Sequence, residues 1–303
     1  MLLAGPTASG KTAVAVCLAR ALKTEIISCD SMQVYRSMPV VTQAPRPKEL
    51  GKVKSRLTAF LDPSEEYSAA RFRDDALKRI AAAQKRGRPA LIVGGTGLYF
   101  RALLDGLFEH EGPSRDLKFR QKLVCEEAHA GAGHLHARLS AVDAVAAAKI
   151  HPNDQRRLLR ALEVYELTGV PFSAQKANRS GLRAEGGFRF FFLDRERADL
   201  YARVDRRVET MVRAGLVREV KRLLRKQLSQ TAGMALGVRE VTAYLEGRTT
   251  LPEALETLKM NTRRYAKRQL SWFRHERDVE RVPVAADETP RETARRILEL
   301  LKK

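Results

Sequence analysis

Hydrophobic residues along the chain alternate between short continuous runs and longer stretches with helical periodicity. The runs MLLAG (1–5), EIISCD (25–30) and PALIVGGTG (89–97) are short and apolar and end at glycine or a carboxylate, which is typical of buried strands. Between them, KTAVAVCLARAL (11–22) and YSAARFRDDALKRIAAAQKRG (67–87) are rich in helix formers. This alternation predicts a parallel α/β sheet with helices on both faces.

The pattern becomes helical throughout from residue 113. We expect Asn153 to cap a helix that Gly169 ends, because these residue types favour the two helix ends. Residues 170–188 are rich in glycine, serine and arginine and are expected to form a loop. FRFFFLD (188–194) then returns to a strand pattern.

Basic amphipathic helices are expected after this strand, at 196–227 and 251–276. Thr250 is a suitable N-cap for the second of them. Pro252 would then lie in the first turn, where proline is tolerated. Near the start of the chain, Ser68 is a suitable N-cap in the same way.

The length of 303 residues suits one large domain or two smaller ones. We expect an α/β core formed by residues 1–112 and 189–303, interrupted by an all-helical insertion at 113–188. No run approaches the ~20 apolar residues of a membrane span, and no signal-peptide pattern is visible. The three cysteines lie far apart, which argues against a disulfide framework or a zinc finger. We therefore expect a cytoplasmic protein.

The charge balance indicates a polyanionic partner. Fifty-six Lys and Arg residues against 36 Asp and Glu residues give a net charge of +20. Nucleic acid is the commonest partner of so basic a surface, and a surface that is basic only for solubility is the alternative. One helical stretch combines basic with aromatic side chains: Arg263, Arg264, Tyr265, Lys267, Arg268, Trp272, Phe273, Arg274 and Arg277. It suits contact with a phosphate backbone, although its aromatic residues could equally belong to the core.

GPTASGKT (5–12) fits the phosphate-loop pattern G-x-x-x-x-G-K-[ST]. Its glycines allow a tight turn whose backbone N–H groups converge on phosphate oxygens. Lys11 adds a positive charge, and the hydroxyl group of Thr12 can bind Mg²⁺. Because the motif follows a predicted strand and precedes a predicted helix, it indicates phosphate binding more strongly than a chance glycine turn.

A kinase or nucleotide hydrolase with this loop should also have an apolar strand that ends in an Asp for Mg²⁺. The strand ALIVGG (90–95) ends in glycine instead. Asp30 is the strand-terminal carboxylate nearby, and it should face the same crevice as the phosphate loop. There it could bind a metal or act as a general base. The alternative is a structural role in a helix cap or a surface turn.

Six sequence blocks occur in a specific order, and they are distributed along the chain from residue 5 to residue 274. They are GPTASGKT (5–12), DSMQVYR (30–36), DPSEEYSAARFRDDA (62–76), GGTGLYFRALLDG (94–106), IHPNDQRRLLRALEVYELTG (150–169) and RRYAKRQLSWFR (263–274). The ordered set closely resembles bacterial tRNA dimethylallyltransferases, also called tRNA isopentenyltransferases. Members of this family transfer a dimethylallyl group from dimethylallyl diphosphate to N6 of the adenosine 3′-adjacent to the anticodon, in tRNAs that read codons beginning with U. The resemblance implies a P-loop NTPase-like fold with a helical insertion.

The resemblance also implies roles for individual residues. The phosphate loop would bind the donor's diphosphate through Gly5, Pro6, Thr7, Ala8, Ser9, Gly10, Lys11 and Thr12, with Mg²⁺ on Thr12. Lys11 and Thr12 would stabilise the leaving diphosphate, and Asp30 would accept the N6 proton. The positions that match tRNA contacts of the family are Asp30, Ser31, Met32, Gln33, Thr96, Arg120, Arg156, Arg157, Leu158, Leu159, Arg160, Gly237 and Arg239. The target base would have to leave the anticodon stack to reach Asp30. We expect a monomer, because the tRNA would occupy the main cleft.

Three segments depart from the family pattern. PVVTQAP (39–45) stands where a DIGTAKP-like run is usual and loses its lysine, and SRLTAF (55–60) lacks the paired histidines of an HHLID-like segment. In MALGVRE (234–240), Met234 and Val238 replace a polar residue and a tyrosine. These changes concern tRNA affinity, substrate range or full activity, and they leave the phosphate loop and Asp30 intact.

Other functions stay open at this point. A P-loop kinase of a small metabolite would consume nucleotide without tRNA. An adenylate isopentenyltransferase would prenylate free nucleotide, but the long insertion and the basic C-terminal helices argue against it. A tRNA-binding protein with impaired activity would bind tRNA but not the prenyl donor. We expect no metal site at His134 and His136, because residues two apart on a helix point to different faces.

Overall fold

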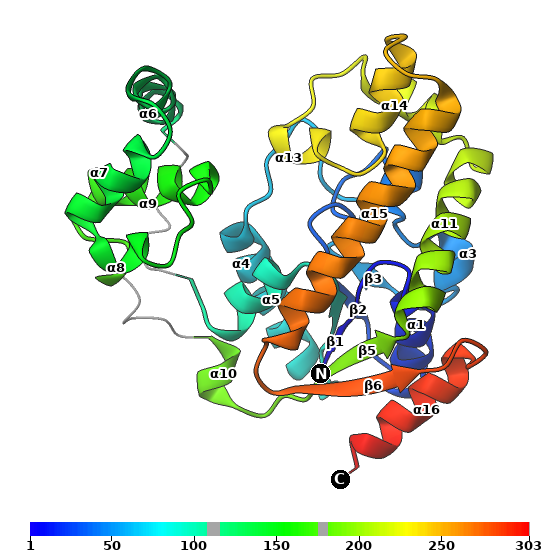
Figure 1. The fold of residues 1–303 in the computed structure, drawn as a ribbon. Helices are drawn as coiled ribbons and strands as arrows, with labels where there is room; N and C mark the ends of the chain where they lie inside the picture. The colour runs from blue at the N-terminus through cyan, green and yellow to red at the C-terminus, as the bar shows by residue number, and fades with distance from the viewer. Residues whose placement is uncertain (108–115, 175–180, 303) are drawn as a thin grey trace. The chain divides into compact units, whose positions relative to one another are not determined.

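The computed structural model describes residues 1–107, 116–174 and 181–302 (Figure 1). The chain divides into two compact units. The first unit comprises Met1–Leu103 and Gly186–Lys303, and the second comprises Leu104–Glu185. The boundary expected from the sequence at 112/113 lies outside the described residues.

The first unit is built on a six-stranded sheet with the order β3-β2-β4-β1-β5-β6, and all neighbouring strands are parallel. The strands are β1 (Leu2–Ala4), β2 (Ile26–Cys29), β3 (Ser55–Arg56), β4 (Leu91–Gly94), β5 (Phe190–Arg195) and β6 (Val279–Val284). In the central register, Leu3 of β1 lies opposite Val93 of β4 on one side and Phe191 of β5 on the other. The predicted parallel α/β fold is confirmed.

The helices of this unit cover both faces of the sheet. They are α1 (Lys11–Ala21), α2 (Pro39–Thr42), α3 (Pro47–Leu50), α4 (Ala69–Gln84), α5 (Gly97–Leu104), α11 (Arg197–Arg213), α12 (Leu216–Leu223), α13 (Gln230–Gly233), α14 (Val238–Leu245), α15 (Leu251–Arg274) and α16 (Pro290–Leu300). Figure 1 shows α1 and α16 together against one face, with α5 and α15 against the other. Among the described residues, no helix combines the length and the apolar character that crossing a membrane requires.

The run FFFL of β5 packs against helices on both faces of the sheet. Phe191 and Leu193 pack in the cluster formed with α1 and α16. Phe190 and Phe192 point the other way, where their rings contact Phe273 of α15 at centroid distances of 6.2 and 5.2 Å. A strand buried on both faces needs apolar residues at consecutive positions, because successive side chains alternate between the faces.

Several predicted helix ends are confirmed, and one predicted helix is wrong. The Ser68 side chain accepts a hydrogen bond from the backbone N–H of Arg71, and Thr250 caps α15 with Pro252 in its first turn. The single helix expected at 196–227 is two helices, α11 and α12. They are separated at Gly215, whose φ of 93° interrupts the right-handed helical path.

The second unit is helical. Its helices are α6 (Leu117–Ala130), α7 (His134–Val142), α8 (Ala144–Ala147), α9 (Gln155–Thr168) and α10 (Leu182–Glu185). Asp154 caps α9, so the expectation that Asn153 is the cap is wrong by one residue. Gly169 ends the helix with a φ of 66°, as predicted. The short α10 lies in a segment that the sequence indicated to be a loop.

Candidate active site

The phosphate loop connects β1 to α1 at the carboxyl edge of the sheet. Gly5 is required by close packing, because a Cβ atom there would lie 2.8 Å from Ser9 Oγ. Gly10 has a φ of 93°, and Ala8 also adopts a left-handed conformation with a φ of 66°. The first-turn N–H groups of α1 have no acceptor within the helix, and the helix dipole makes this end positive. The local geometry therefore suits an anion.

Three arginines hold three consecutive residues of the loop. The hydrogen bonds are Arg207 Nη1 to Thr7 Oγ1 (3.1 Å), Arg203 Nε to the carbonyl of Ala8 (2.9 Å) and Arg195 Nε to the carbonyl of Ser9 (3.4 Å). Arg203 and Arg207 lie four residues apart and so share one face of α11. Arg195 ends β5 and is fixed by bonds of 2.8 Å to Asp199 and to the carbonyl of Ala285.

The positive charges of this region are partly withdrawn from water. Lys11 Nζ donates to the carbonyl of Pro6 at 2.6 Å. Burial, followed by the charge of Arg207, lowers the pKa of Lys11 to about 7, while Asp30 acts in the opposite direction. Burial also lowers the pKa values of Arg203 and Arg207, and neighbouring arginines add to the shift. A bound anion would relieve this crowding of cations.

Asp30 follows β2 directly and lies at the same edge of the sheet. Its Oδ1 accepts hydrogen bonds from the backbone N–H groups of Met32 (2.9 Å) and Gln33 (3.2 Å). Its Oδ2 has no hydrogen-bond partner in the described part of the chain. One carboxylate oxygen is therefore held by the turn, and the other can receive a proton.

Thr96 joins the Asp30 turn to the turn between β4 and α5. Its Oγ1 accepts the backbone N–H of Ser31 at 3.0 Å. Tyr265 of α15 lies beside Thr96, and burial, followed by the charge of Asp30, raises the pKa of its hydroxyl group. The predicted residues from the first two sequence blocks and Thr96 thus lie in one place, with Tyr265 as a neighbour that the sequence analysis assigned only to a basic, aromatic stretch.

That stretch of α15 divides between the core, the site and the surface. Phe273 is buried in the core, which is one of the two roles that the sequence left open for the aromatic residues. Trp272 is half-buried and packs on Gly97, where a Cβ atom would lie 2.3 Å from its Cδ2 atom. The guanidinium group of Arg101 lies 4.9 Å from the Trp272 ring. Arg264, Lys267 and Arg268 are exposed.

Gln269, also on α15, is buried and connects two parts of the site. Its Oε1 accepts the backbone N–H of Thr7 at 2.8 Å, and its Nε2 donates to the carbonyl of Gly95 at 2.9 Å. No sequence motif marks this residue or the three arginines that hold the loop. The spacing of Arg203 and Arg207, four residues apart on a basic helix, could have indicated that their side chains point in the same direction.

The structure places the remaining predicted residues elsewhere. Gly237 is the N-cap of α14 with a φ of 102°, and Arg239 is exposed on the same helix. The other predicted residues lie in the second unit. Arg156 is exposed, Arg157 pairs with Asp154, and Leu158 is buried in the core of this unit with Leu159 partly buried against it. Arg120 and Arg160 both bind the buried Glu163.

The segments that depart from the family pattern are well anchored. Val40 and Val41 of PVVTQAP donate their backbone N–H groups to the buried carboxylate of Glu219, at 3.0 and 2.8 Å. The side-chain amide of Gln33 donates to the carbonyl of Gln43 at 3.2 Å, which links this segment to the Asp30 turn. In MALGVRE, Val238 is buried, whereas Met234 is 44% exposed.

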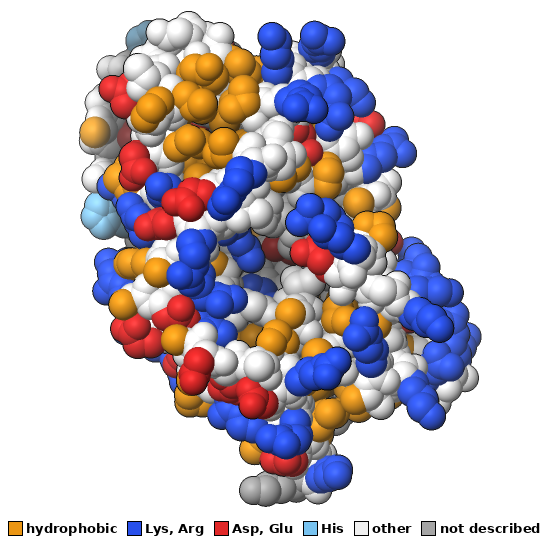
Figure 2. Space-filling model, turned by 90° about the vertical axis from the view of Figure 1, so that its right-hand side faces the viewer, with side chains coloured by type: hydrophobic (Ala, Val, Ile, Leu, Met, Phe, Trp, Pro, Cys, Tyr) orange, Lys and Arg blue, Asp and Glu red, His pale blue; other side chains and the backbone are white. Residues whose placement is uncertain are grey.

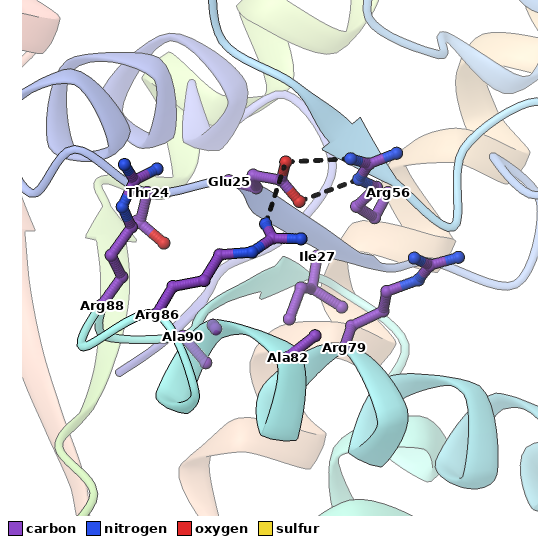
Figure 3. A pocket seen from close by; sticks show the side chains of 10 residues that line it. Thr24, Glu25, Ile27, Arg56, Arg79, Ala82, Arg86, Arg88 and Ala90 are labelled. Atoms are coloured by element: carbon purple, nitrogen blue, oxygen red, sulfur yellow. Dashed lines mark hydrogen bonds and ion pairs between the residues drawn. The ribbon is translucent and has the colours of Figure 1, made fainter.

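Two clefts in the described part of the chain lie near the sheet. One adjoins Thr12 of the phosphate loop, and polar side chains (Thr12, Ser28, Gln33 and Ser55) and apolar ones (Ala15, Ile26, Pro45, Leu50 and Val93) line it. The other lies near the amino ends of β2 and β4. Figure 3 shows the guanidinium groups of Arg56 and Arg86 directed at the carboxylate of Glu25 there. Of these two clefts, the first is the one that a residue of the phosphate loop, Thr12, lines.

The sequence matches the family model described as IPP transferase over residues 33–276. The chain belongs to the IPP transferase family. It is a transferase, and its resemblance to the tRNA dimethylallyltransferases is confirmed. Its parallel sheet and phosphate loop give the P-loop NTPase-like fold that the resemblance implied.

Curated relatives match the chain over nearly its full length. A tRNA dimethylallyltransferase of Symbiobacterium thermophilum is 45% identical over 100% of this chain and 94% of its own. Another, of Carboxydothermus hydrogenoformans, is 43% identical over 91% of this chain and 89% of its own.

Solved structures of the family have the same fold. The tRNA isopentenylpyrophosphate transferase of Bacillus halodurans is 39% identical and has a TM-score of 0.71. The match covers 99% of this chain and 96% of that one. A eukaryotic dimethylallyltransferase, described as acting on tRNA, has a TM-score of 0.78 at 27% identity. The match covers 93% of this chain and 73% of that one.

Proposed function

We propose that this IPP transferase is a tRNA dimethylallyltransferase. It would transfer the dimethylallyl group of dimethylallyl diphosphate to N6 of the adenosine 3′-adjacent to the anticodon, in tRNAs that read codons beginning with U. The observation that carries the proposal is the juxtaposition of the phosphate loop with the Asp30 turn, through Thr96 and α15. The relatives named tRNA dimethylallyltransferase support the choice of reaction.

The loop suits a diphosphate leaving group. Lys11 and Arg207 bring positive charge to it, and the hydroxyl of Ser9 is buried without a hydrogen-bond partner among the described residues. Such a hydroxyl can donate to a phosphate oxygen. As the bond between C1 of the prenyl group and oxygen breaks, its electron pair goes to the diphosphate, and these donors stabilise the developing charge.

Asp30 is the proposed general base. The N6 amine attacks C1 of the prenyl group, a new C–N bond forms, and the proton lost from nitrogen goes to Asp30. Because Oδ1 is fixed by two backbone N–H groups, Oδ2 is the oxygen that would accept it. Thr96 and Ser31 lie beside it and would contact the target nucleotide.

The hydroxyl group of Thr12, in the first turn of α1, suits Mg²⁺, because oxygen is the ligand that Mg²⁺ prefers. Mg²⁺ usually binds few protein groups besides phosphate oxygens and water, so Thr12 would hold it. When bound, the ion would neutralise charge on the leaving diphosphate.

The surface charge suits a tRNA partner. Figure 2 shows Lys and Arg side chains spread over the drawn face, more densely than acidic ones. The exposed Arg264, Lys267 and Arg268 lie on α15, the helix that also carries Tyr265. Contacts of this kind to phosphates give affinity that falls with salt concentration. We propose that one chain acts as a monomer on one tRNA.

The test uses total tRNA from a strain that lacks its own prenyltransferase. The purified chain with dimethylallyl diphosphate and Mg²⁺ should add one C₅H₈ unit to a subset of these tRNAs, as measured by mass spectrometry. Asp30→Asn should lower kcat by about 10²- to 10⁴-fold, which is the usual contribution of a general base, and should retain tRNA binding.

The outcomes separate the other functions. Unchanged tRNA mass with the wild-type chain refutes the proposal. Consumption of nucleotide without tRNA would indicate a small-molecule kinase, and prenylation of free AMP would indicate an adenylate isopentenyltransferase. Tight tRNA binding without binding of the prenyl donor would indicate a tRNA-binding protein with impaired activity.

A further inference from the structure

We propose that Gln269 is a positioning residue. It sets the distance between the phosphate loop and the turn that carries Thr96, and so aligns the two substrates for transfer. This inference rests on the proposed function and names a determinant of the same site. It concerns a side chain that lies outside the phosphate loop and the Asp30 turn.

The two hydrogen bonds of Gln269 join distant parts of the chain. The carboxamide accepts from the N–H of Thr7, 262 residues earlier, and donates to the carbonyl of Gly95, 174 residues earlier. The side chain is buried, with 6% of the residue exposed. Because the carboxamide is planar and rigid, a single group fixes the spacing between the two backbone segments.

Glycine allows this close approach. A Cβ atom at position 95 would lie 2.4 Å from Nε2 of Gln269 and 3.1 Å from the carbonyl oxygen of Gly5. At position 94 it would lie 1.9 Å from the carbonyl oxygen of Cys29, the residue before Asp30. The ends of β1, β2 and β4 therefore meet with backbone against backbone, and Gln269 closes this junction.

The neighbouring residues on α15 lie against the turn between β4 and α5. Tyr265, one turn earlier, lies beside Thr96, and Trp272, one turn later, packs on Gly97. Gln269 contacts this turn and is also hydrogen-bonded to the phosphate loop, through the N–H of Thr7. It is thus the residue whose loss would change the spacing of the two segments.

The spacing matters because transfer requires the amine and the prenyl carbon to approach closely. Reacting atoms must lie about 3–3.5 Å apart, and a misplacement of about 1 Å can lower the rate by about 10²-fold. The phosphate loop positions the prenyl carbon through the donor's diphosphate, whereas Thr96 and Asp30 position the amine. A change in the distance between them should therefore lower kcat with little effect on the affinity for either substrate.

The variant is Gln269→Glu, which is nearly isosteric. The carboxylate can still accept the N–H of Thr7, but it cannot donate to the carbonyl of Gly95. The matched control is Thr262→Val, because Thr262 is also buried on α15 and its hydroxyl binds only within the helix, to the carbonyl of Leu258. Both variants are made in the full chain.

We expect Gln269→Glu to lower kcat by about 10- to 100-fold. The KM for tRNA and the Kd for inorganic pyrophosphate should stay within about threefold, and Thr262→Val should leave kcat within about twofold. The ratio of variant to wild-type kcat should rise as the pH is lowered, because the introduced carboxyl group can donate the second bond once it is protonated. A kcat within twofold of wild type, or a loss explained by pyrophosphate affinity alone, overturns the inference.

A second measurement does not depend on activity. Pyrophosphate should slow amide hydrogen exchange in the peptide that covers residues 95–100 of the wild-type chain, and this protection should be lost in Gln269→Glu but kept in Thr262→Val. If wild-type chain leaves tRNA unmodified, the proposed function fails, and the exchange result decides the inference alone. The inference is overturned if pyrophosphate slows exchange equally in wild type and Gln269→Glu, or if it does not slow exchange in wild type.

Discussion

Arg207 offers the sharpest test of the electrostatics at the phosphate loop. Its Nη1 binds Thr7 Oγ1, and its charge is the second cause, after burial, of the lowered pKa of Lys11. Arg207→Met keeps much of the length of the side chain but removes the charge and the donors. It should therefore weaken diphosphate binding and at the same time raise the pKa of Lys11.

The two effects have predictable sizes. A hydrogen bond to a charged group contributes about 1.5–3 kcal/mol, so pyrophosphate should bind about 10- to 150-fold more weakly. The pKa of Lys11 is about 7 in the wild-type chain. It should move upward in the variant but stay below its ordinary value, because burial, the larger cause, persists.

The assay is calorimetric titration with pyrophosphate from pH 5.5 to pH 9. Protonated Lys11 attracts the anion, so wild-type affinity should fall as the pH rises through about 7, and the fall should occur at higher pH in Arg207→Met. Titration of pyrophosphate itself is common to both proteins and cancels in the ratio of their affinities. A ratio that does not change with pH would refute the coupling between Arg207 and Lys11.

Two further changes test charge pairs away from the loop. The hydrogen bond from Arg56 lowers the pKa of Glu25, so the pair should stabilise the fold above pH ~5 and lose this effect as the pH falls below the ordinary pKa of a glutamate. Glu25→Gln should therefore cost up to about 1 kcal/mol at pH 7 and much less near pH 3, measured by urea denaturation. In the second unit, Glu163→Gln leaves Arg120 and Arg160 without their buried counter-charge and should cost about 3–5 kcal/mol. An unchanged urea midpoint would contradict the buried role of Glu163.

The strands that the sequence predicted are those buried on both faces. β1, β2, β4 and β5 are continuous apolar runs, and their hydrophobic signal is independent of their neighbours. β6 was missed because VERVPV mixes valines with charged residues and a proline, a composition found at sheet edges. β3 has two residues, too few for any periodicity.

The same distinction applies to the site. The phosphate loop and Asp30 are local patterns, so their place beside each other follows from the rule that parallel strands end at one edge. Arg195, Arg203 and Gln269 act on the loop from far along the chain, and only tertiary packing brings them there. Their chemical types are common on helix surfaces, so no residue pattern marks Gln269 in advance.

The way in which the chain enters and leaves the second unit has a consequence for folding order. Arg183 binds Asp105 at 2.7 Å, and Gly181 lies against the backbone of Leu104, so the two ends of this unit are side by side. β1 must pair with β4 before the unit and with β5 after it. If the helical unit folds first, it brings these partners closer and lowers the loop-closure entropy cost of the β1–β5 pairing. The insertion would then act as a folding aid for the sheet that it interrupts.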